Sequence, residues 1–88
     1  MSRYTTKSTY LGKGRWGCRV FVDGELWCEA VVASKASIAP AFRDLMRTAD
    51  ILTKGNSHTM AARDRMNLDK NKPYYLSVTH YWQGEKLT

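Results

Sequence analysis

Apolar and polar residues alternate in two short stretches of this 88-residue chain, 16–22 and 26–32. A two-residue period over a short run is typical of β-strands that bury one side. Between the two stretches stands the dipeptide Asp23-Gly24, which favours the tight turn of an antiparallel hairpin. The pattern therefore predicts a β-hairpin over residues 16–32.

The length of the hairpin loop decides which side chains share a face. A two-residue Asp-Gly loop would mix acidic and apolar side chains on one face. A three-residue loop, 22–24, instead places Val20 opposite Leu26 and Cys18 opposite Cys28, so one face becomes uniformly apolar. We therefore predict the three-residue loop, with Gly24 in the left-handed conformation. The opposite, solvent-facing side is then expected to carry Arg19, Phe21, Glu25, Trp27 and Glu29.

Residues 38–52 repeat their apolar positions at steps of three and four, which predicts an amphipathic helix lying on the apolar face of the hairpin. Ser37 suits the N-cap, Pro40 is tolerated in the first turn, and Gly55 suits the C-terminal cap. The apolar stripe consists of Ile38, Phe42, Leu45, Met46, Ala49 and Leu52. One main helix is therefore expected after the hairpin.

A short second helix is predicted after residue 56. Ser57 or Thr59 would cap it, and Ala62 and Met66 would point inward. Its outward side would carry Arg63 and Arg65. The first ten residues of the chain are polar and rich in Thr, Ser and Tyr, and they fit either a strand or an arm that orders only on binding.

Residues 74–82 read as a final strand with two distinct sides. One side carries Tyr74, Leu76, Val78, His80 and Trp82, and the other carries Tyr75, Ser77, Thr79 and Tyr81. The whole chain, 1–88, is expected to form a single α+β domain. Its three- to four-stranded antiparallel sheet would carry one main helix on one face, in the order (β)ββα(α)β.

The charge of the chain narrows the kind of partner. The formal net charge is +6, from 14 basic and 8 acidic residues. Residues 1–22 hold five basic residues and no acid, residues 51–73 hold a second basic group, and the stretch 21–50 is net acidic. Such a polarised surface favours an anionic partner, although excess charge also serves solubility. Without a signal peptide or an apolar run long enough to cross a membrane, the chain is expected to be a soluble, cytoplasmic protein with no membrane partner.

The residue types that carry catalysis or bind metals are sparse. Cys18 and Cys28 stand ten residues apart, and the only other soft ligands are His58 and His80, so the short spacing of zinc sites is missing. A zinc site and a disulfide remain open, but two reduced thiols in the core are favoured. His80 lies on the apolar side of its strand, which favours a packed side chain over a catalytic base. We expect a non-enzymatic protein with no cofactor and no metal.

Nucleic acid, DNA or RNA, is the favoured partner. Aromatic and cationic side chains on a sheet face can stack on bases and neutralise phosphates. The same combination also suits a host protein as partner, and the oligomeric state is left open. The candidate binding residues are Lys13, Arg15, Arg19, Phe21, Trp27, Arg63, Arg65, Lys70 and Lys72, with Lys7 as a further flanking cation.

Two resemblances bear on this expectation. The stretch "GRWGCRVFVDGELWCEAVVASKASIAPAFRDL" has a W-x-x-x-V strand, a turn glycine and an S-K-x-S helix start. It is similar to the arm-type DNA-binding domains of phage integrases, which implies a three-stranded sheet against one helix, with the sheet reading DNA. The small size, basic charge and ββα pattern also resemble short accessory proteins of tailed phages, which bind host proteins or nucleic acid. That likeness implies a host-takeover role in the host cytoplasm, and neither likeness assigns a role to an individual residue.

Overall fold

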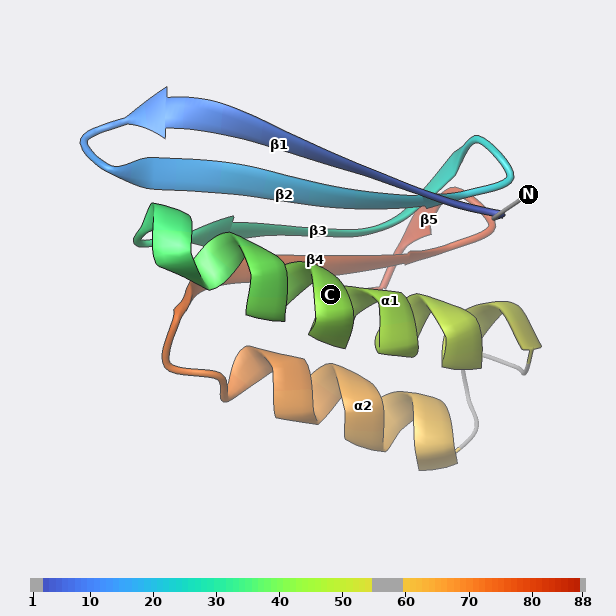
Figure 1. Ribbon diagram of the computed structural model, residues 1–88. Coiled ribbons are helices and arrows are strands. Elements are labelled where there is room, and N and C mark those ends of the chain that lie inside the picture. The colour runs from blue at the N-terminus through green and yellow to red at the C-terminus, as the bar shows by residue number, and fades with distance from the viewer. Residues whose placement is uncertain (1–2, 55–59, 88) are drawn as a thin grey trace.

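In the part of the chain that the structure describes, five antiparallel strands form one sheet in the order of the chain, and two helices cover one of its faces (Figure 1). The computed structural model describes residues 3–54 and 60–87. The strands are β1 (Tyr4–Gly12), β2 (Arg15–Val22), β3 (Glu25–Val32), β4 (Tyr75–Trp82) and β5 (Glu85–Lys86). A 3₁₀ turn (Lys35–Ser37) and the helices α1 (Ile38–Lys54) and α2 (Met60–Lys70) connect β3 to β4.

The expected α+β class, the antiparallel sheet and the single main helix are confirmed, but the strand count of three to four is wrong. The N-terminal segment forms the strand β1 rather than an arm. The polar C-terminal segment adds β5, because a tight turn folds it back against the end of β4. Figure 1 shows α1 and α2 on the same side of the sheet, so both helices leave the other face bare.

Each of the three hairpins turns on a dipeptide that ends in glycine. At Asp23-Gly24 the φ angles are 52° and 84°, and this double left-handed conformation belongs to the two-residue type I′ turn. Positive φ at both central positions favours glycine at the second, because it has no Cβ to clash. The same pair of positive φ angles occurs at Lys13-Gly14 and Gln83-Gly84. The predicted three-residue loop at 22–24 is therefore wrong.

A β-bulge at Trp27 resolves the conflict between the two-residue turn and the burial of the apolar residues. Next to the turn, Phe21 pairs with Leu26, but beyond the bulge Val20 pairs with Cys28. Trp27 is the extra residue in β3, and a bulge changes which side the following residues face. The hairpin therefore keeps its two-residue turn, and the apolar side of β3 still faces the helices.

Glu25, Leu26 and Trp27 lie on the opposite side of β3 from the one expected, and the cysteine pairing differs. Glu25 pairs with Val22, whose side chain is buried toward the helices. Trp27 is buried in the core with 8% of its surface exposed, instead of facing outward. Leu26, opposite Phe21, shares the uncovered side, and Cys18 pairs with Ala30 instead of Cys28. The expectation of reduced cysteines in the core is confirmed, because Cys18 and Cys28 are free thiols with no exposed surface.

The main helix packs as its periodicity predicts. Leu45, Ala49 and Leu52 are completely buried against the sheet. Ser37 does not cap α1 as expected. A 3₁₀ turn precedes the helix, and Ser34 occupies the N-cap position of that turn. The hydroxyls of Ser34 and Ser37 lie 3.0 Å apart. The expected caps Gly55, Ser57 and Thr59 lie outside the described residues.

The second helix and the last strand each contain one departure from the expected pattern. In α2, Ala62 and Met66 are buried as expected, but Arg65 turns inward and contacts the buried Asp69 instead of pointing outward. In β4 a register shift at Leu76 leaves that side chain 57% exposed. The shift also turns Tyr75 toward the helices, where its hydroxyl donates to the carbonyl of Ala41. Tyr75 is therefore not on the face where it was expected.

Trp27→Ala should lower the free energy of unfolding by about 3–5 kcal/mol, because it removes a large buried aromatic ring from the core. Phe21→Ala, on the uncovered face of the same hairpin, should cost only about 1–2 kcal/mol, because that ring is half-buried. Urea unfolding of both variants measures the difference. Equal losses would contradict the placement of Trp27 in the core.

Candidate functional site

The uncovered face of the sheet presents two rows of side chains that run across β1, β2, β3 and β4. Residues directly opposite each other on neighbouring strands point to the same face. The first row is polar and charged and consists of Lys7, Arg19, Glu29 and Thr79. The second row is small and consists of Thr9, Gly17, Val31 and Ser77. We call this surface, together with the β1–β2 turn at Lys13-Gly14, the open face.

Glu29 is the acid in the middle of the charged row, and two neighbours satisfy its carboxylate. Arg19 Nε lies 3.2 Å from Glu29 Oε2, and the Tyr81 hydroxyl donates to Oε1 at 2.9 Å. This bond to the carboxylate raises the pKa of Tyr81. The Arg19 side chain still exposes 58% of its surface. The acid therefore orients the guanidinium and leaves it accessible to a ligand.

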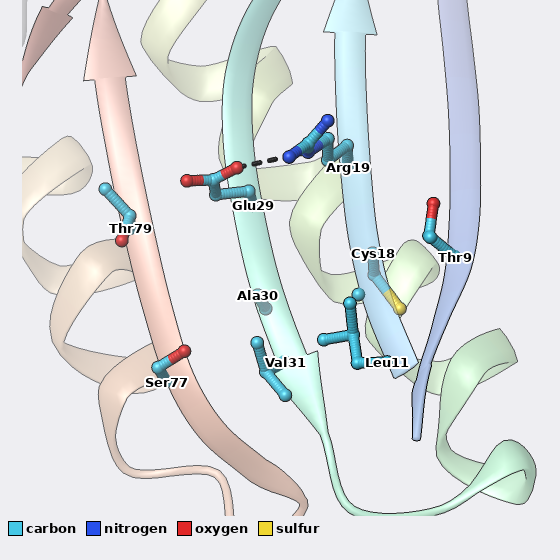
Figure 2. A pocket seen from close by; sticks show the side chains of 10 residues that line it. Thr9, Leu11, Cys18, Arg19, Glu29, Ala30, Val31, Ser77 and Thr79 are labelled. Carbon is cyan, nitrogen blue, oxygen red and sulfur yellow. Dashed lines mark hydrogen bonds and ion pairs between the residues drawn. The ribbon is translucent and has the colours of Figure 1, made fainter. Parts of the chain in front are cut away.

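A hollow of about 300 Å³ lies beside Gly17, and the Leu11 side chain covers part of this glycine. Figure 2 shows the hollow from the open face, with the helices behind the sheet and the Arg19–Glu29 pair on one rim. Leu11 and Val31 supply apolar walls, and Thr9, Ser77 and Thr79 supply hydroxyl groups. The volume is at the lower end of the range of ligand pockets, which start near roughly 300 Å³.

Three further cations belong to the β1–β2 hairpin, which also supplies Thr9, Leu11 and Gly17 to this hollow. Lys7 lies in the charged row, Lys13 lies in the turn, and Arg15 begins β2 on the side of Gly17 and Arg19. All three are exposed and form no ion pair with the residues that the structure describes. Their charge is therefore available to a ligand.

The basic residues around α2 lie on the other side of the molecule, in the helical layer. Arg65 Nη2 is 4.0 Å from Asp69 Oδ1 and donates to the carbonyl of Asp44, and Lys72 Nζ lies 3.7 Å from Asp44 Oδ2. These two cations hold the helices and the following turn together. Arg63 and Lys70 are exposed but face away from the sheet.

The candidate residues named from the sequence therefore divide into three groups. Lys13, Arg15, Arg19 and Phe21 share the hairpin that forms part of the open face. Trp27 belongs to the core. Arg63, Arg65, Lys70 and Lys72 lie in the helical layer, so one flat ligand cannot contact them together with the open face.

A buried polar network was not anticipated from the sequence. Asp69 Oδ2 accepts a hydrogen bond from the Thr48 hydroxyl at 2.7 Å and lies 2.8 Å from His80 Nε2, and all three residues have no exposed surface. The sequence does contain one indication that Asp69 is buried, because Asp69 follows Met66 by three residues and so occupies the buried side of α2. The network joins α1, α2 and β4.

Cys28 pairs with His80 across β3 and β4, which assembles a thiol, an imidazole and a carboxylate in one region of the core. Burial raises the pKa of the Cys28 thiol, and the charge of Asp69 raises it further. Nucleophilic cysteines need the opposite, a lowered pKa and access to a substrate. This cluster therefore stabilises the fold, and it lacks the features of a nucleophilic site.

Cys18 and Cys28 should resist modification by a disulfide reagent at pH 8 in the folded protein. Burial raises the pKa of both thiols, so they stay protonated at this pH and out of reach. In urea both should react at once, and the native rate should follow global unfolding. Rapid labelling of either thiol under native conditions would contradict this placement.

The comparisons with known proteins give no information on the class of this protein. The chain matches no model of a protein family, and neither the curated proteins nor the solved structures contain a significant match. Among residues 3–54 and 60–87, no helix is long and apolar enough to cross a membrane, and no cluster of ligating side chains could hold a metal ion. The two resemblances named above stay predictions.

Proposed function

We propose that the protein is a nucleic-acid-binding module that contacts its ligand through the open face. The observation that carries this proposal is the bare side of the sheet, on which Lys7, Arg15 and Arg19 are exposed around a hollow. Cations that line a surface attract the phosphate backbone and release its counterions. Hydroxyl groups of threonine and serine add neutral donors for phosphate and sugar oxygens.

The charge balance of this surface favours a polyanion. Glu29 is an acid of the open face, and Arg19 and Tyr81 already occupy its two oxygens. Lys7, Lys13 and Arg15 have no acidic partner within the described part of the chain. A phosphate chain running along the β1–β2 hairpin would meet four cations in succession.

The hollow gives the proposed complex a place for one base. A ring in the hollow beside Gly17 would contact Leu11 and Val31, and its polar edge would reach the hydroxyls of Thr9 and Ser77. Single-stranded nucleic acids can turn a base out in this way, whereas paired bases are held in the stack. We therefore propose single-stranded nucleic acid as the preferred form.

Lys7→Ala should weaken binding of a fluorescein-labelled single-stranded DNA of about 20 nucleotides by about tenfold, since it removes one charge-assisted phosphate contact. Fluorescence anisotropy between about 50 and about 200 mM salt should also show the slope of log K against log salt falling by about 1 in magnitude. The matched control is Lys70→Ala, which removes the same charge from the helical layer and should leave affinity nearly unchanged. Equal losses in both variants, or no binding at the lowest salt, would refute the open face as the site.

Gly17→Val should fill the hollow and weaken the same binding by about fivefold or more, because one base would lose its apolar contacts with Leu11 and Val31. An ideal Cβ at Gly17 would lie 3.6 Å from Leu11 Cδ1, an ordinary contact, and Leu11 is exposed enough for its side chain to move aside for the methyl groups of valine. Strand propensity favours valine over glycine, so the melting temperature should stay the same or rise. Thr6→Val, on the helix side of β1, is the control, and undiminished affinity of Gly17→Val would exclude the hollow from the site.

A further inference from the structure

The outer edge of β1 exposes backbone hydrogen-bonding groups. β1 is the first strand of the sheet, and within residues 3–54 and 60–87 it pairs with β2 alone. The amide of Asp23 donates to the carbonyl of Arg3 at 2.9 Å. This bond shows which residues of β1 direct their backbone groups to β2. Because alternate residues of an antiparallel strand direct their backbone groups to the same neighbour, Thr5, Lys7 and Thr9 face β2. The amides and carbonyls of the residues between and after them, Thr6, Ser8 and Tyr10, therefore face outward.

This edge has little of the usual protection against pairing with another chain. Natural edge strands are short, carry charges or proline, or are covered by another element. β1 has nine residues and no proline, its one charged residue is Lys7, and its bulge at Leu11 lies beside the turn. Thr6 and Ser8 are exposed, since α1 contacts β1 only near its beginning, at Tyr4. The strand at the opposite end of the sheet, β5, has only two residues.

The edge is also held in an extended form. The Tyr4 hydroxyl donates to Asp50 Oδ1 of α1 at 2.7 Å, which ties the beginning of β1 to the helical layer. Near its end, the ring of Tyr10 contacts Trp16 with centroids 5.1 Å apart. A strand that is already ordered loses little conformational entropy when another strand joins it.

Charge determines which kind of strand fits. In the antiparallel register that pairs residues 4–10 of two copies completely, Lys7 would stand directly opposite its own copy. Like charges in that position are destabilising, and each copy carries a net charge of +6. A carboxylate opposite Lys7 would instead form an ion pair at a position where the two strands approach most closely, because Lys7 directs its own backbone bonds to β2.

We propose that the outer edge of β1 binds an extended acidic segment of a partner protein as a sixth strand. The backbone groups of Thr6, Ser8 and Tyr10 supply the pairing, and Lys7 selects an acidic residue opposite it. This mode is strand addition, in which main-chain bonds give affinity and side chains give specificity. It does not depend on nucleic-acid binding by the open face.

The first test uses the full chain and a fluorescent peptide, Thr-Val-Thr-Glu-Thr-Val-Thr, with blocked ends. Two altered peptides accompany it: one has lysine in place of the glutamate, and one is N-methylated on the residues either side of the glutamate. We expect saturable binding of the first peptide and a loss of about tenfold or more for each of the others, since each loses charge-assisted or backbone hydrogen bonds. The amide resonances of Thr6, Ser8 and Tyr10 should shift on binding. Equal binding of the N-methylated peptide, or no saturable binding up to millimolar peptide, would overturn the proposal.

Variants of the protein provide the second test. Ser8→Pro removes an outward amide that the β1–β2 ladder does not use, so the fold should persist while peptide binding is lost. Ser8→Ala keeps the amide and is the matched control, expected to bind like the parent protein. Lys7→Glu avoids proline and should reverse the preference toward the lysine peptide, and an unchanged preference would refute the role of Lys7. A dimer of the chain alone that Ser8→Pro abolishes would show that the edge binds a second copy, which would overturn the acidic partner.

Discussion

The bulge at Trp27 determines which side of the sheet each residue of β3 faces. The type I′ turn at Asp23-Gly24 fixes the start of the pairing, and without an extra residue Cys28 would face away from the helices. With the bulge, Trp27 and Cys28 both enter the core, while Glu29 lies beside Arg19 on the open face. The core and the charged row therefore depend on the same local irregularity, because one missing or added residue would exchange them.

The sequence predicted the parts of the fold that follow from a regular period. The strands of the first hairpin, the stripe of α1 and the buried side of α2 were recoverable because neighbouring positions repeat at two, three or four residues. The bulges could not be predicted in this way, because a bulge interrupts the period at one residue. The same sequence fits either a longer loop or a bulge. The loop at 22–24 was chosen to keep one face apolar, and the bulge at Trp27 achieves that burial with the shorter turn.

The candidate site was only partly predictable, because closeness along the chain does not determine which face of the domain a residue occupies. Arg19 could be assigned to one side of the first hairpin strand, whereas Arg15 was expected only as a cation outside that strand. Arg65 and Lys72 belong to the second basic stretch, but in the fold they contact Asp69 and Asp44. The spacing of Asp69 from Met66 indicates a position on the buried side of α2, but no pattern in the sequence shows which cations contact these two acids. Only the packing of α2 against α1 and β4 reveals it.

The two proposed surfaces meet at Lys7. Its ammonium group belongs to the charged row of the open face, whereas the backbone groups at the edge belong to Thr6, Ser8 and Tyr10. An added acidic strand would place its carboxylate beside Lys7 on the open face, because residues opposite each other share a side. That carboxylate would neutralise one of the four cations offered to a phosphate chain. It would also repel the phosphates that lie next to it. Each ligand would thus weaken the other, and the coupling free energy must be the same whichever binds first. The placement of one lysine at the edge of the sheet is sufficient to link the two kinds of binding.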